Sequence, residues 1–115
     1  MIDSFAWFEY FAGSARGKSV DDALRSEETI ATPASCLAEI KRKRRREGKP
    51  WQGEITFMKS WSVIVPLTEE IALRAGGISE LHFADALVYA TALENNAVLI
   101  TGDSHFKNLP KVEMI

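Results

Sequence analysis

The chain has 115 residues, 46% of them hydrophobic, and a formal net charge of −2. This length predicts a single domain, residues 1–115, with one modest core. No apolar run approaches the ~20 residues of a membrane span, and the first residues include acids where a signal peptide would be basic. The only cysteine, Cys36, has no partner for an internal disulfide. We therefore expect a cytoplasmic protein in which Cys36 is a small buried apolar residue.

The small net charge hides a strong asymmetry along the chain. Residues 41–49, KRKRRREGK, contain seven of the fourteen basic residues and one acid, so this segment carries +6. The rest of the chain carries −8. Such polarity indicates a protein that holds cations at one place and meets an anionic partner at another.

The first predicted elements are a very short strand and an aromatic helix. Only two residues precede Asp3, whereas strands usually have about five. Either this strand is unusually short, which would hold Asp3 weakly, or further residues precede Met1. Residues 5–11, FAWFEYF, predict a helix that ends at Gly13. Its aromatic side chains point to more than one face, so the helix is either clamped between sheet and loops or partly covered by another chain.

The next predicted elements lead into the basic segment. A short helix is predicted over residues 20–25 and a short strand over 28–31. Thr32 and Pro33 then predict the N-cap and first residue of a helix that carries Glu39 and continues into the basic run. A further helix is predicted over residues 54–61, or from a slightly earlier start, and a buried β-branched strand over 62–67.

The second half predicts two helices and two strands. Thr68 caps a helix that ends at the glycine pair 76–77. Ser79 is the predicted N-cap of the next helix, with Ile78 and Phe83 as a hydrophobic staple, and this helix ends near Glu94. Strands are predicted over residues 97–101 and 112–115. Alternating strands and helices indicate an α/β fold with a parallel sheet.

Four acids are predicted to meet at one edge of this sheet. Asp3 and Asp103 each follow a strand, and Glu39 and Asp85 lie early on helices that could lean over the same edge. Their negative charges would repel one another unless cations neutralised them. Oxygen ligands without a Cys or His set select Mg²⁺, or Mn²⁺ as a substitute, over zinc. Because a bound ion lowers the pKa of water, such a site suits hydrolysis of phosphodiesters.

Four motifs carry a resemblance to a known family. IDS at 2–4, LAEI at 37–40, FADALVYATA at 83–92 and LITGD at 99–103 resemble PIN-domain ribonucleases, and the nearest subgroup is the VapC-type toxins of toxin–antitoxin pairs. The segment between Arg74 and Phe83 is shorter than is usual in that family. The resemblance implies a PIN-like three-layer fold, with a parallel four- to five-stranded sheet flanked by helices.

The resemblance also implies a function and a site. It implies Mg²⁺-dependent cleavage of RNA, a homodimer and a small antitoxin partner. Ser4 and Thr101 match small hydroxyl positions beside two of the acids, where they would orient carboxylates or water. The acid quartet, as catalytic residues and metal ligands, maps onto Asp3, Glu39, Asp85 and Asp103.

Other residues have open readings. The basic run is either a solvated helix end that suits the helix dipole or a contact for the RNA backbone. His105 either touches a substrate phosphate or shapes its turn. The tryptophans at 51 and 61 are expected to pack rather than stack on bases. The candidate RNA-binding residues are Lys41, Arg42, Arg45, Arg46 and His105.

Three functions remain to be weighed. The preferred hypothesis is a metal-dependent endoribonuclease, the toxin of a type II toxin–antitoxin system. The alternative is a catalytically weakened PIN-like module that binds RNA or a protein partner without cutting, which the short first strand would favour. A phosphoacceptor receiver domain is disfavoured, because Asp3 has no acidic neighbour and Lys107 and Lys111 lie in a loop.

Overall fold

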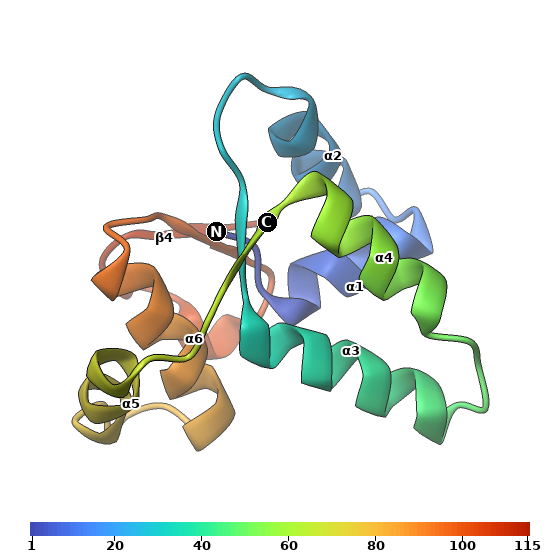
Figure 1. The fold of residues 1–115 in the computed structure, drawn as a ribbon. Helices are drawn as coiled ribbons and strands as arrows, with labels where there is room; N and C mark the ends of the chain where they lie inside the picture. Colours follow the sequence, from blue (N-terminus) through green and yellow to red (C-terminus); the bar gives the residue numbers. More distant parts are fainter.

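The computed structural model describes residues 1–115 as helices around short parallel strands (Figure 1). The helices are α1 (Ser4–Ala12), α2 (Gly17–Arg25), α3 (Ala34–Arg46), α4 (Gln52–Trp61), α5 (Glu69–Gly76) and α6 (Phe83–Glu94). The strands are β1 (Ala31–Pro33), β2 (Val63–Val65), β3 (Leu99–Thr101) and β4 (Val112–Met114), and a 3-10 turn, η1 (Ser104–Phe106), follows β3. No helix has the length and apolar character needed to cross a membrane.

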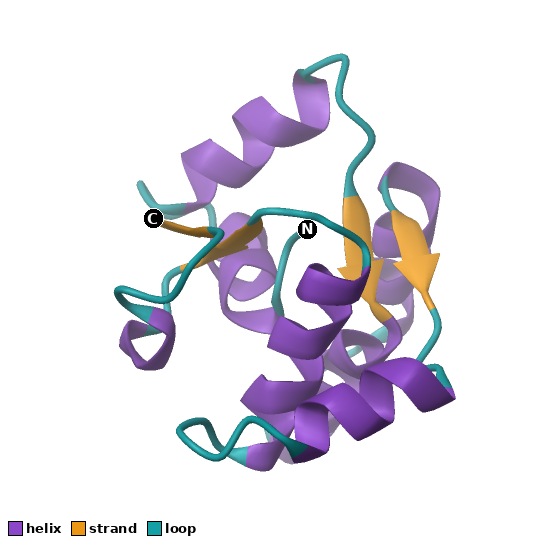
Figure 2. Cartoon of the chain, turned by 90° about the vertical axis from the view of Figure 1, so that its left-hand side faces the viewer, coloured by secondary structure: helices purple, strands orange, loops and turns teal.

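The strands form two parallel pairs that the N-terminal residues connect. β1 pairs with β2, and β3 pairs with β4, both in parallel. Between them Ile2 forms a single parallel bridge to Ile100 and donates its N–H to the carbonyl of Ala31, at 2.9 Å. Figure 2 shows the N-terminus between the two pairs. The predicted α/β fold is confirmed, although the expected four- to five-stranded sheet is reduced to two pairs joined by one bridged residue.

The expectation that Asp3 would be weakly held is wrong. The terminal ammonium of Met1 donates to the carbonyl of Val98 at 2.8 Å, and Ile2 is fully buried. The N–H of Asp3 donates to the carbonyl of Ile100 at 3.3 Å, and its carboxylate accepts from the N–H of Ala6 at 2.9 Å, capping α1. Two residues therefore suffice to anchor Asp3, because both of their neighbours in the sheet supply hydrogen bonds.

The predicted start of α3 is wrong by one residue, and the predicted start of the strand before it is wrong by three. β1 runs through Pro33, and α3 begins at Ala34 without a side-chain cap. Thr32 does not cap the helix because its hydroxyl is buried, accepting from Trp7 Nε1 at 3.0 Å and lying 2.8 Å from Ser62 Oγ. Partners distant in the sequence thus override the local capping preference of Thr32.

The predicted start of α6 is also wrong. The helix begins at Phe83 with His82 at the N-cap and no side-chain hydrogen bond there, so Ser79 is not the cap. Phe83 is 75% exposed and forms no staple with Ile78, which instead packs on the apolar core between α5 and α6. The predicted buried strand is likewise an exposed edge, because Val63 of β2 is 55% exposed.

Two helical groups flank the strands. α1, α2 and α4 gather on one side and α5 and α6 on the other, with α3 running below β1 in Figure 1. Trp7 of α1 is fully buried with Ile40 and Met58, whereas the other aromatic side chains of α1 are only partly buried. Cys36 is fully buried, as predicted. Two predicted helix boundaries are confirmed: Gly13 ends α1 in a left-handed conformation, φ 68°, and Thr68 is the N-cap of α5.

Candidate metal centre

The four acids predicted from sequence line one pocket of about 200 Å³. Asp3 is the N-cap of α1, Glu39 lies in the second turn of α3, Asp85 lies in the first turn of α6, and Asp103 follows β3. Helix starts and strand ends meet at this edge because all the strand pairs are parallel. The other residues that line the pocket are Ser4, Phe5, Phe8 and Val88.

Glu39 is oriented by a hydroxyl from another helix. Ser4 Oγ donates to Glu39 Oε1 at 2.8 Å, which links α1 to α3 at the rim of the pocket. Asp103 is oriented from its own strand, since its N–H donates to Thr101 Oγ1 at 3.0 Å. Both hydroxyl residues singled out from the sequence therefore lie beside a carboxylate, and Thr101 is completely buried.

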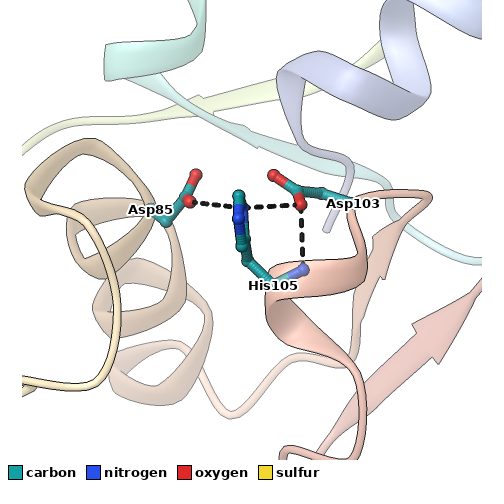
Figure 3. A group of neighbouring side chains, drawn as sticks. All are labelled: Asp85, Asp103 and His105. Atoms are coloured by element: carbon teal, nitrogen blue, oxygen red, sulfur yellow. Dashed lines mark hydrogen bonds and ion pairs between the residues drawn. The ribbon is translucent and has the colours of Figure 1, made fainter.

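His105 lies between two of the acids (Figure 3). Its Nδ1 is 2.9 Å from Asp103 Oδ1 and 3.7 Å from Asp85 Oδ2, and its backbone N–H also donates to Asp103 Oδ1 at 2.9 Å. The ring packs edge-to-face on His82, with 5.3 Å between centroids. His105 thus shapes its turn, as one of the two readings expected, and also faces the pocket. The sequence pointed to no histidine ligand, and the only local hint was its place two residues after Asp103.

Burial makes the acids costly to ionise in the absence of a cation. The pKa of Asp3 rises from 3.8 to about 7, mainly because the carboxyl is buried, and the nearby Asp103 and Glu39 add to the rise. Hydrogen bonds with Thr101 and Ala6 oppose it. Burial, and then negative neighbours, also raise the pKa values of Glu39 and Asp85.

The donor set fits a divalent cation. No Lys or Arg forms an ion pair with any of the four acids, and the only basic group within ion-pair distance is His105. Ligand atoms of Asp85, Asp103 and His105 lie within 4.8 Å of one another, close enough to share one ion. Carboxylate oxygens favour Mg²⁺ or Mn²⁺, and one imidazole nitrogen is compatible with the latter.

The other candidate residues lie outside this pocket. Lys41, Arg42, Arg45 and Arg46 line a separate hollow of about 540 Å³ on the outer face of α3. A third hollow, of about 620 Å³, lies between α1, α2 and α4 and is lined by Tyr10, Phe11 and Phe57 among others. Its two acids, Asp21 and Glu54, are each paired with an arginine. The pocket of about 200 Å³, whose four acids have no such partner, is therefore the better candidate for catalysis despite its smaller size.

Solved structures of other proteins share this fold. The structure matches a chain of a toxin–antitoxin complex from Klebsiella pneumoniae with a TM-score of 0.82 and 20% identity, covering 98% of this chain and 94% of the other. It also matches VapBC2 from Rickettsia felis bound to a DNA fragment from their promoter, with a TM-score of 0.75, 17% identity, and 100% and 96% coverage. At these identities the matches establish the fold. No curated protein matches the sequence.

The family follows from the sequence itself. A model of the PIN domain matches residues 1–112, which is nearly the whole chain. The match includes all four acids and both hydroxyl residues beside them, and it is inconsistent with a receiver domain. The chain belongs to the PIN-domain family.

Proposed function

We propose that this chain is a metal-dependent endoribonuclease and the toxin of a type II toxin–antitoxin pair. The observation that carries the proposal is the convergence of Asp3, Glu39, Asp85 and Asp103 in one pocket without a Lys or Arg counterion. Such a cluster is stable in its ionised form only with a cation. Membership of the PIN-domain family and the similarity to toxin–antitoxin complexes support the same function.

The four acids are the proposed ligands of Mg²⁺ or Mn²⁺. When bound, the ion would lower the pKa of water and offset the charge that develops on the phosphate. Ser4 holds Glu39 through its 2.8 Å hydrogen bond, and Thr101 holds the backbone of Asp103, so both position ligands. Neither hydroxyl has a general base beside it, and we assign neither as a nucleophile. His105 is placed to contact either the ion or a substrate phosphate.

Amide variants of the acids test this proposal. Asp85→Asn and Asp103→Asn keep the size of the side chain and remove its charge, so we expect Mg²⁺-dependent cleavage of labelled RNA to fall at least a hundredfold while the fold persists by circular dichroism. Asp22→Asn is the matched control, because Asp22 is an exposed acid of α2, paired with Lys18 and outside the pocket. Cleavage by Asp85→Asn at the parent rate would refute the mechanism.

The alternative is a PIN-like module that binds without cutting. A weakly held Asp3 would have favoured this alternative, but Asp3 is held by hydrogen bonds of its backbone and its carboxylate. Calorimetric titration distinguishes the two functions. Absence of Mg²⁺ or Mn²⁺ binding at millimolar concentrations would favour the module.

An antitoxin is the proposed protein partner. The relatives of similar structure are described as a toxin–antitoxin complex and as VapBC2. The hollow between α1, α2 and α4, with the partly buried rings of Tyr10, Phe11 and Phe57, offers an apolar surface for one of its segments. This would be the other chain that the aromatic helix suggested. Protection of these residues from hydrogen exchange in the complex would support the assignment.

We also propose that the chain forms a homodimer and acts in the cytoplasm. Leu73 of α5 and Phe83 of α6 are 72% and 75% exposed, more than any other large apolar side chain of the chain. Because α5 and α6 pack together, one subunit interface could cover both. Light scattering that gives the mass of a single chain at micromolar concentration would refute the dimer.

A further inference from the structure

The basic segment of α3 is divided between two faces of the helix. Arg44 is bound within the chain: its guanidinium donates to Glu54 at 2.6 Å and to Glu47 at 3.0 Å, and lies over the ring of Phe8. The ammonium of Lys43 lies 4.4 Å from the centroid of the same ring. These two side chains therefore fasten α3 to α1 and α4.

The remaining cations form what we call the basic face, which consists of Lys41, Arg42, Arg45 and Arg46. All four are exposed, and none forms an ion pair with a carboxylate. Lys41 has only the ring of Trp51, 4.2 Å away. The helix C-terminus favours cations, but like charges three and four residues apart repel one another. Folding alone therefore gives little reason to place them together.

The basic face begins beside the acid pocket. Arg42 and Arg46 follow Glu39 by three and seven residues, which places all three on the same side of α3. At 1.5 Å per residue, Arg42 lies about 4.5 Å and Arg46 about 10 Å further along the helix axis. That length corresponds to about three nucleotide steps of a stacked strand at ~3.4 Å each.

The chemistry of the face suits phosphates. Three of its four cations are arginines, whose planar guanidinium groups bind phosphate oxygens through two hydrogen bonds. They line one open hollow rather than scattered positions, so several phosphates of one strand can be held at once. The acid pocket can hold a cation, and the unpaired cations beside it can hold a polyanion. Helix α3 contributes to both, through Glu39 in the pocket and through the basic face.

We propose that the basic face binds the backbone of a single-stranded RNA segment on one side of the phosphate that enters the acid pocket. The identity of the ligand rests on the proposed function, but the binding itself does not require cleavage. An acidic segment of a protein partner is the competing occupant, and measurement of RNA binding distinguishes the two.

The experiment measures RNA binding without cleavage. Anisotropy of a fluorescent single-stranded RNA of twelve nucleotides is followed in EDTA at several KCl concentrations, for the parent and for the double variant Arg42→Ala/Arg46→Ala. Each lost phosphate contact lowers the salt slope by about 0.7, so the double variant should lose about 1.4 in slope and bind roughly 25-fold more weakly at ~0.1 M salt. Both arginines are exposed and without an ion pair, so the fold should persist.

The matched control removes the same charge elsewhere. Arg25→Ala/Lys59→Ala takes two exposed cations from α2 and α4, outside the basic face. We expect its salt slope to equal that of the parent. Equal losses in both variants, or no loss in either, would overturn the proposal, and the second result would leave an acidic protein segment as occupant. Loss of binding only in the α3 variant supports the proposal even if no variant cuts RNA, in which case the proposed nuclease function fails separately.

Discussion

Replacing Asp3 with Asn should stabilise the metal-free protein while abolishing the proposed RNA cleavage. Asp3 is only 4% exposed, and its pKa rises from 3.8 to about 7 on folding, mainly through burial. Between about pH 4 and pH 7 the folded protein therefore binds a proton that the unfolded chain does not. The free energy of unfolding must fall as the pH rises through this interval and then level off above pH 7.

The size of the effect follows from the two pKa values. At about 1.4 kcal/mol for each pKa unit, a rise from 3.8 to about 7 corresponds to a loss on the order of 4 kcal/mol above pH 7. Asn cannot ionise, so the variant avoids this loss. It also keeps the cap of α1, because the amide oxygen can still accept from the N–H of Ala6. Because the pKa values of Glu39 and Asp85 are also raised, the free energy of unfolding of the variant should still fall with rising pH, but less than that of the parent.

Urea denaturation in EDTA at pH 5, 6, 7 and 8 measures the effect. The parent should lose stability over this range, and Asp3→Asn should be more stable than the parent at pH 8. Millimolar Mg²⁺ should then stabilise the parent and leave the variant nearly unchanged, because only the parent has the full set of proposed ligands. A parent stability that is constant from pH 5 to pH 8, or a variant that is less stable at pH 8, would refute the reasoning.

Two glycine substitutions test the packing around the site. A Cβ at Gly102 would overlap the ring of Phe5 in the acid pocket, coming 2.7 Å from its Cδ1, so Gly102→Ala should displace that ring and lower RNA cleavage more than it lowers the melting temperature. A cleavage rate equal to that of the parent would show that the position of Phe5 does not matter. A Cβ at Gly17 would lie 2.7 Å from the carbonyl carbon of Glu9. Because backbone cannot yield as a side chain does, Gly17→Ala should cost about 1–3 kcal/mol and lower the melting temperature by roughly 5–20 °C in thermal denaturation. An unchanged melting temperature would mean that α1 and α2 separate without cost.

The sequence by itself determined the order of the helices and strands and pointed to the four acids that line the candidate site. Local sequence preferences explain why these elements were predictable. Gly13 ends α1 because it adopts a positive φ, and Thr68 caps α5 with its own hydroxyl. Residues 83–94 form one continuous helix. The family model agrees, matching residues 1–112. Parallel strands then bring Asp3 and Asp103 to one edge, although a hundred residues separate them, because the carboxyl ends of such strands always meet.

Only the tertiary structure decided where local preferences yield to distant partners. Thr32 stays in β1 because Trp7 and Ser62 bind its hydroxyl, so it does not cap α3. His105 faces Asp85 as well as Asp103 only because α6 and the turn after β3 come together in space. The basic run likewise reads as one charge cluster in the sequence. Which of its cations are held by Glu54 and Phe8, and which remain free for an anion, depends on helices packed against α3, and no local pattern encodes that choice.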